Sequence, residues 1–253
     1  MIETSAVMAP LGVAVQSAPS SGLGFWLVLL ALLAVVPFLL TIITPFAKFV
    51  IVFGITRHAL GLPQIPPNTV ITGLALILTV HTIAPVAETA LARYEASADT
   101  TDVRVADRVI DAIEAPMTDF LSRNASDRYI ALFESLGNRL RAGPGEGAAR
   151  SDSIDAAAYL GEWMDPELAD RTLRALTVLA PAFMLTELTE AFQVGFLIFI
   201  PFLIIDLLVS NVLLAMGMHM MAPTPVALPL KLLLFVLVAG WEVVIQGLVL
   251  GYA

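Results

Sequence analysis

Residues 191–230 decide the fold class, and they read AFQVGFLIFIPFLIIDLLVSNVLLAMGMHMMAPTPVALPL. Asp206 is the only residue in this stretch that carries a formal charge. A helix crosses a bilayer with roughly 20 apolar residues, so the stretch is too long for a single crossing. We expect one membrane-embedded helix and then a turn at Gly217–Pro229, where three prolines remove backbone hydrogen-bond donors.

The composition of the whole chain points the same way. Of the 253 residues, 58% are hydrophobic and 14% are charged, whereas soluble domains have about 25% charged residues. The net charge of −9 disfavours a nucleic-acid-binding protein, which needs a basic surface. The chain has no cysteine and three scattered histidines, so we expect neither a disulfide scaffold nor a thiolate or histidine metal site, and no cofactor.

Two further uncharged runs lie in the first third of the chain. Gly22–Ala47 is long enough to span a bilayer, and Asn68–Ala87 follows two prolines that suit a helix start, with Asn68 as its cap. Between these runs, Lys48 and Arg57 mark a short link. We expect this link to face water in the cytoplasm, because basic residues favour that side of the membrane.

The middle of the chain is different in character. Glu88–Arg174 holds 17 acidic and 10 basic residues, a charge density that must face water. Apolar residues recur within it at helical spacing, which predicts two or three amphipathic helices. These residues are Val105, Val109, Ile113, Phe120, Tyr129, Phe133, Leu136 and Leu140. Ala142–Ser153 has the composition of a flexible linker.

These patterns predict an all-α membrane protein in which two hydrophobic helical hairpins flank a soluble acidic helical domain. The N-terminus lacks the basic start of a signal peptide, so we interpret it as uncleaved. The predicted parts are an N-terminal polar tail at 1–21, a first hydrophobic hairpin at 22–87, an acidic extracytoplasmic helical domain at 88–174 and a second hydrophobic hairpin with a methionine-rich tip at 175–253.

The sequence gives little support to an enzyme. It contains no HExxH, GxSxG, GxxxxGKS/T or GxGxxG motif. Glu187 and Glu190 share a helix face, but paired carboxylates need a substrate cleft to be catalytic. We therefore interpret them as packing or ion-pairing groups and predict that the chain is not an enzyme.

Five ionisable residues lie in apolar sequence, where an unpaired charge costs about 3 kcal/mol, and they are Glu187, Glu190, Asp206, Lys231 and Glu242. We expect ion pairs between subunits, with Lys231 meeting Glu187 or Asp206 of its own or a neighbouring subunit. A proton or ion relay is the alternative. Lys231 and Glu242 are expected on one helical stripe, because their spacing is close to three whole turns. Loss of Lys231 should harm assembly more than loss of Lys48, which we expect to be hydrated.

The segment Met216–Met221 holds four of the nine methionines, and they flank His219. On one helix these side chains would point to opposite sides, so no single core face could bury them all. A loop that presents them to a shared surface is more economical, because thioether side chains are flexible and polarizable. Ordinary apolar filling of a core is the other interpretation.

A resemblance to a known family starts at Arg57–Asn68, which reads RHALGLPQIPPN. This run is similar to the signature of the FliP/SctR family, the core membrane subunits of the type III secretion export gate. This sequence departs from the family at His58, where Asn is usual, and at His219, which interrupts the methionine triplet. Further matches follow in order at Ala191–Leu207, Ser210–Met218 and Ala227–Trp241. The motif residues are Arg57, Gly61, Pro66, Pro67 and Asn68.

The resemblance implies a subunit that forms a homopentamer in the bacterial inner membrane, within the basal body of the secretion system. It implies as partners a small SctS/FliQ-type subunit, an SctT/FliR-type subunit, an SctU/FlhB-type switch protein and the unfolded proteins that are exported. In the family the assembly is largely lifted above the membrane plane, and a methionine tip constricts the channel. The resemblance thus assigns a channel gasket to Met218, His219, Met220 and Met221.

Two alternatives stay open. The injectisome (SctR-type) branch is favoured over the flagellar (FliP-type) branch, because the N-terminus reads as uncleaved and Ser210–Met218 looks more like that branch. A small-solute transporter or ion-channel subunit is the rival function. It predicts inverted internal repeats, and we find no convincing repeat between the two hydrophobic parts.

Overall fold

A computed structural model of the chain describes residue 30 and residues 33–35, 37–97, 105–142 and 166–252. Every regular element in these residues is helical, which confirms the all-α fold class. The predicted polar tail and the predicted linker beyond Ala142 lie outside the described residues. The chain from Leu40 to Ala253 forms one compact unit.

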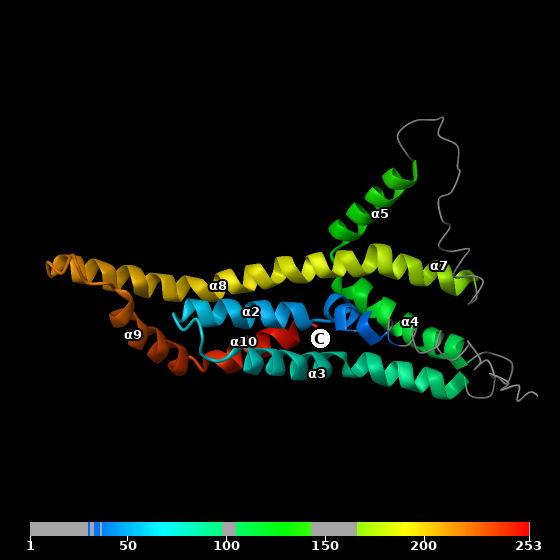
Figure 1. Ribbon diagram of the computed structural model, residues 1–253, viewed down its shortest axis with the longest axis horizontal. Helices are drawn as coiled ribbons and strands as arrows, with labels where there is room; N and C mark the ends of the chain where they lie inside the picture. Colours follow the sequence, from blue (N-terminus) through cyan, green and yellow to red (C-terminus); the bar gives the residue numbers. More distant parts are fainter. Residues whose placement is uncertain (1–29, 31–32, 36, 98–104, 143–165, 253) are drawn as a thin grey trace, which may run out of the picture. The chain divides into compact units, whose positions relative to one another are not determined.

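Among the residues that the structure describes, two stretches are long and apolar enough to cross a membrane, α3 (Asn68–Ala96) and the continuous run Glu167–Ala215. Two bent pairs in the same described residues also meet that criterion when each pair is taken together, Pro37–Ile43 with α2 (Phe46–Ala59) and α9 (Thr224–Leu237) with α10 (Gly240–Leu250). The apolar helices agree with a membrane-embedded chain, whereas the two-hairpin arrangement stays a prediction. In chain order the elements are α2 (Phe46–Ala59), α3 (Asn68–Ala96), α4 (Val105–Asn124), α5 (Asp127–Ala142), α7 (Pro166–Arg174), the π-helical segment η2 (Ala175–Leu179), α8 (Ala180–Ala215), α9 (Thr224–Leu237) and α10 (Gly240–Leu250) (Figure 1).

Helix α8 is the scaffold against which α2, α4, α5 and α9 pack. It spans 36 residues and accommodates Pro201 in its interior. The segment η2 joins it to α7 without a break, so the helical run passes through Arg174, where the predicted acidic domain ends. Helix α3 likewise runs through Ala87, the predicted end of the first hairpin. These boundaries lie inside helices, and the division into domains stays a prediction.

Helix α2 packs along α8 (Figure 1). It replaces the hydrated link that the sequence predicts around Lys48, so that prediction is wrong. Gly195 of α8 permits the close approach of the two helices, because a Cβ at that position would lie 2.4 Å from Cδ1 of Ile55 in α2. Residues Lys48–Ala59 of the predicted link are therefore helical, whereas residues 60–67 form a turn that leads to α3.

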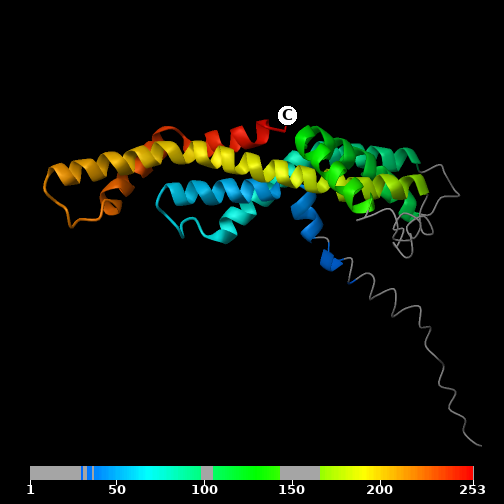
Figure 2. The same ribbon diagram turned by 90° about the horizontal axis from the view of Figure 1, so that it is seen from above.

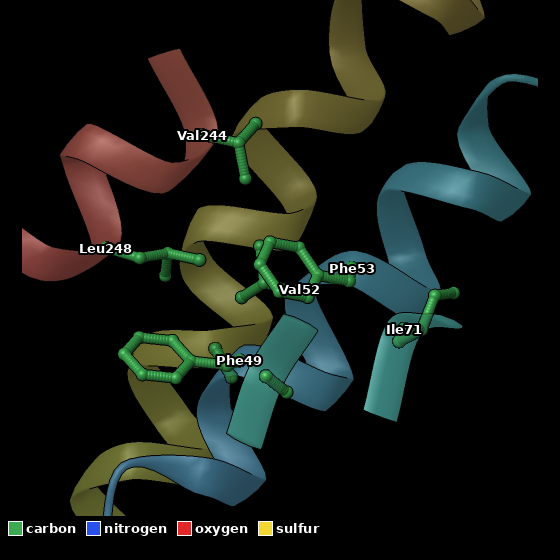
Figure 3. Close-up of a cluster of buried hydrophobic side chains, with 8 residues drawn as sticks. Phe49, Val52, Phe53, Ile71, Val244 and Leu248 are labelled. Carbon is green, nitrogen blue, oxygen red and sulfur yellow. The ribbon is translucent and has the colours of Figure 1, made fainter. Parts of the chain in front are cut away.

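One core cluster lies where α2, α3, α8 and α10 meet (Figure 3). The indole of Trp241 in α10 packs edge-on against Phe53 of α2, with 6.0 Å between the ring centroids. The end of the chain thus returns to the first helices of the unit. The buried members of the cluster are Phe49, Val52, Phe53, Ile71, Ala75, Ala191, Val244 and Leu248.

The described residues of the acidic middle of the chain are helical, as predicted, and α4 and α5 pack on the first part of α8. The backbone N–H of Ser126, between α4 and α5, donates to Oγ1 of Thr186 over 2.9 Å. Arg174 pairs with Glu134 of α5 over 2.8 Å. The buried contact consists of Phe120, Leu121, Ala125, Leu179, Ala182 and Phe183. Part of the predicted apolar faces stays exposed, at Val109, Ile113, Leu136 and Leu140.

The last apolar run of the chain is broken into two helices. Helices α9 and α10 are bent by 57° relative to each other, and Ala239 between them has a left-handed φ of 51°. Gly240 follows, and a Cβ there would lie 2.2 Å from Cε2 of Phe235. Lys231 is buried and Glu242 is exposed. The predicted shared stripe of these two charges is therefore wrong, because it assumed one continuous helix.

Candidate functional site

The methionine-rich tip, Met216–Met221, lies in the loop that joins α8 to α9 (Figure 2). Helix α8 ends through Gly217, whose φ is 77°. The N–H of Met218 donates to the carbonyl of Leu213 over 2.9 Å, and the N–H of Gly217 donates to that of Leu214 over 3.0 Å. This pair of bonds is a Schellman motif, which ends the helix at a residue that adopts positive φ without a steric penalty.

All four methionines of the tip are exposed. Met220 is 101% exposed, and Met218 is the least exposed of the four at 38%. The N–H of Met221 donates to the carbonyl of Met218 over 3.2 Å, which closes a β-turn with His219 and Met220 at its corner. His219 is exposed as well. The four predicted gasket residues therefore share one exposed turn, and their role in a seal stays a prediction.

The loop is shorter than the sequence predicts. Helix α9 starts at Thr224, so only Pro223 of the three prolines lies in the loop, at the N-cap position. Pro225 is in the first helical turn, where a missing N–H has no helical partner. Pro229 lies inside α9 and leaves one carbonyl of that first turn without its helical donor.

Lys231 of α9 and Asp206 of α8 form an ion pair, with 2.7 Å between Nζ and Oδ2. The same Nζ donates to the carbonyl of Ala59, 3.1 Å away at the end of α2. Because the last carbonyls of a helix lack helical donors, this bond satisfies a group that would otherwise be unpaired. Lys231 thus joins three helices within one chain, and ion pairing between subunits stays a prediction.

A second buried charge cluster joins α2, α8 and the end of the chain. Nζ of Lys48 lies 2.6 Å from Oε2 of Glu190 and 3.8 Å from Oε2 of Glu187. The O–H of Tyr252 donates to Glu187, and the Tyr252 ring centroid lies 4.5 Å from Nζ of Lys48. Of the two partners predicted for Lys231, the structure therefore supplies Asp206, because Glu187 contacts Lys48 instead.

The sequence analysis predicts no role in a buried cluster for two of these residues, Lys48 and Tyr252. The side chain of Lys48 is 5% exposed, so the prediction of a hydrated lysine is wrong. A signal was present, because Phe49–Thr56 holds no charged residue that would keep the segment in water. Tyr252 offered no comparable signal, since its position depends on the return of α10.

The charge cluster borders a polar cavity of about 210 Å³, whose wall also includes Arg123, Asn124 and Thr186. Both carboxylates in this wall, Glu187 and Glu190, already contact Lys48. A carboxylate held by a cation is a poor general base for a substrate. The geometry therefore favours ion pairing of these groups over acid–base chemistry.

The family motif forms the connection between α2 and α3. Gly61, with a φ of 79°, ends α2 in a second Schellman motif. Nη1 of Arg57 donates to the carbonyl of Pro66 over 3.1 Å and to Oδ1 of Asn68 over 2.7 Å. Asn68 is the first residue of α3, and no side chain caps that helix. The predicted Asn cap is therefore wrong, because the amide holds Arg57 and Pro67 occupies the N-cap position.

The outward faces of α3 and α8 expose many large apolar side chains. Soluble monomers rarely expose contiguous apolar patches of more than a few hundred Å², so lipid or another protein is expected to cover these faces. On α3 the exposed residues include Val70, Leu76, Ile77 and Val80, and on α8 they include Phe192, Phe196, Leu197, Leu203, Ile204, Leu207 and Leu208.

The sequence profile of the FliP family matches residues 29–248. The chain belongs to the FliP family. The match contains Lys48, the methionine-rich tip and Lys231, whereas Tyr252 lies beyond it. The resemblance seen in the sequence is thereby confirmed.

The alignments with related proteins cover most of the chain. The hypersensitivity response secretion protein HrcR of Ralstonia nicotianae is 35% identical over 229 residues, which is 89% of this chain and 95% of that protein. The Yop proteins translocation protein R of Yersinia pestis is 37% identical over 228 residues, 89% of this chain and 94% of that protein. The flagellar biosynthetic protein FliP of Pectobacterium carotovorum subsp. carotovorum is 36% identical over 244 residues, 94% of this chain and 83% of that protein.

Proposed function

We propose that the chain is a core subunit of the type III secretion export gate, which forms with sister subunits the channel for unfolded proteins across the bacterial inner membrane. The observation that carries the proposal is the family match over residues 29–248. It is supported by relatives that are named for secretion, for translocation and for flagellar biosynthesis. The role is structural and not enzymatic.

The exposed apolar faces of α3 and α8 support a place within a membrane-embedded assembly. Burial against neighbouring subunits satisfies such faces as well as lipid does. We propose a homopentamer, completed by the SctS/FliQ-type and SctT/FliR-type subunits and joined by the SctU/FlhB-type switch protein, within the basal body.

The methionine-rich tip is proposed to be the seal of the channel. It lies at one end of α8, its thioethers are exposed, and the chain from Leu207 to Leu230 contains no Asp, Glu, Lys or Arg that would hold water in a closed ring. Unbranched thioethers repack at low cost. A ring of tips can thus close on itself and also close around an unfolded chain.

Within the family, the injectisome branch is the proposed one. The identities of 35%, 37% and 36% do not separate the branches. The alignments cover 95% and 94% of the two secretion and translocation proteins but 83% of the flagellar protein, which supports the proposal.

The test of this function starts from deletion of the gene in its own host. Secretion should stop and should return with the wild-type chain, because the gate lacks a core subunit without it. Normal secretion in the deletion strain contradicts the proposal and favours the alternative, a small-solute transporter or ion-channel subunit.

The seal is tested on the complex purified with its sister subunits. Replacing Met218, Met220 and Met221 together by alanine should leave the complex assembled but increase its ion conductance in planar bilayers, because the thioethers that fill the ring are gone. Met216→Ala, at an exposed position outside the β-turn, is the control and should not leak. An intact triple variant without added conductance contradicts the seal.

A further inference from the structure

The methionine-rich tip is also a concentrated set of soft metal donors. Within six positions it carries the thioethers of Met216, Met218, Met220 and Met221 and the imidazole of His219, all exposed. The low numbers of cysteine and histidine argue against a thiolate or histidine metal site, but they do not argue against a site made of thioethers. The gasket that the resemblance implies includes His219, but the repacking of thioethers explains only its methionines and gives no role to the polar imidazole.

The backbone of the tip brings these donors together. The hydrogen bond from Met221 N–H to the Met218 carbonyl closes a β-turn over 3.2 Å, and the ends of such a turn lie within about 7 Å of each other at Cα. His219 and Met220 occupy the two corner positions between them. Methionine has three rotatable bonds before its methyl group, so the thioethers at both ends of the turn can reach a common point.

The chemistry of the donors selects the metal. Thioethers are soft ligands that select Cu(I), and imidazole also suits copper. Mg²⁺, Ca²⁺ and Mn²⁺ prefer carboxylate and carbonyl oxygens. The stretch from Leu207 to Leu230 contains no Asp or Glu, so it offers hard cations no anionic ligand. It also contains no Lys or Arg, so no fixed positive charge repels a monovalent cation.

We propose that the tip binds a soft monovalent metal ion, Cu(I) or Ag(I), through the thioethers of Met218, Met220 and Met221 and the imidazole of His219. The site is complete within one chain and does not depend on a ring of tips or on export. In an assembled gate, the bound ion would fix the rotamers of the thioethers and place positive charge at the tip. Metal binding would then stiffen the segment that is proposed to repack.

The test uses the complex with its sister subunits, titrated with Ag(I) in chloride-free buffer and with Cu(I) against a competing chelator. We expect about one ion per copy of this chain at the tip, and at least about a tenfold loss of affinity in His219→Gln and in the variant with Met218, Met220 and Met221 replaced by leucine. Leucine keeps the apolar volume of methionine and removes the sulfur. The matched controls are His81→Gln and Met117→Leu, which should bind as the wild type does.

A second readout keeps the test decisive if the triple variant fails to assemble. With 13C-methyl methionine, Ag(I) should shift the methyl resonances of Met218, Met220 and Met221, assigned through single leucine variants, and should leave those of Met117 and Met184 in place. Equal affinity in wild type and His219→Gln, unshifted tip resonances, or Zn²⁺ binding as tight as Ag(I) binding overturns the proposal. Channel conductance is recorded separately, so a failed metal site and a failed seal give different results.

Discussion

Replacing Lys48 by methionine is expected to destabilise the protein more than replacing Lys231 by methionine. Both lysines are buried. Lys48 contacts Glu187, whose side chain is 1% exposed, and Glu190, whose side chain is 46% exposed, whereas the side chain of Asp206, the partner of Lys231, is 38% exposed. Sequence alone predicts the opposite order, because Lys48 is interpreted as hydrated. Methionine retains an unbranched apolar stem, so both variants chiefly remove the charge.

The loss of folding stability in each variant depends on the polar groups that are left without their lysine partner. In Lys48→Met, Glu187 loses its cation although its side chain is only 1% exposed, and stranding a buried charge costs about 3–5 kcal/mol. In Lys231→Met, Asp206 can be hydrated and the carbonyl of Ala59 loses one hydrogen bond, so the cost is about 1–2 kcal/mol. A difference of roughly 2 kcal/mol is a factor of about 30 in the folding equilibrium.

The assay is unfolding of the chain, purified in mild detergent without its sister subunits and followed by tryptophan fluorescence. Trp241 reports on the core because it packs against Phe53. A double variant, Lys48→Met with Glu187→Gln, removes the stranded charge and should recover part of the loss. Equal losses in the two single variants, or a double variant no more stable than Lys48→Met, would refute the reasoning.

Two further variants test the packing around α10. Tyr252→Phe removes the O–H that donates to Glu187 and should cost about 1.5–3 kcal/mol in the same assay. Tyr129→Phe removes a hydroxyl that lies 3.0 Å from the neutral Oγ1 of Thr189, and it should cost about 0.5–1.5 kcal/mol; equal costs contradict a special role of Tyr252. Gly240→Ala should cost about 1–3 kcal/mol, because its Cβ would overlap an aromatic ring of α9. Gly247→Ala, with open space at Cβ, should instead stabilise α10 by about 0.5–1 kcal/mol; a neutral Gly240→Ala argues against the observed contact.

The sequence predicts those elements that are decided locally. The apolar run after Ala191 specifies a long helix, and the run of methionines around His219 is incompatible with one buried face. Gly217 marks the end of that helix through its positive φ. The helix and the exposed tip could therefore be predicted from neighbouring residues alone.

The buried charge cluster could not be predicted, because its contacts are distant in sequence. Lys48 and Glu190 are 142 positions apart, and Tyr252 and Glu187 are 65 positions apart. Whether a lysine in apolar sequence is hydrated or ion-paired depends on which helix packs over it. The residues next to the lysine do not predict which helix that is.

The predicted turn, Gly217–Pro229, is too long, because proline does not break a helix at every position. Pro225 is compatible with the first turn of α9, where the missing N–H has no helical partner. The real break in the last apolar run is at Ala239, a residue whose left-handed φ carries no sequence signal. This residue type rarely adopts that conformation, so tertiary packing decides it.

The central claim is that the methionine-rich tips of several copies meet around one channel. Because the chain has no cysteine, Met220→Cys introduces a single thiol at the most exposed position of the tip. A short bismaleimide applied to the assembled complex should join these thiols in pairs and give covalent chain dimers, because each chain carries one thiol, whereas Ser135→Cys, exposed on α5, should stay monomeric. If an intact complex carrying Met220→Cys gives only monomer, the tips do not meet and the account is contradicted.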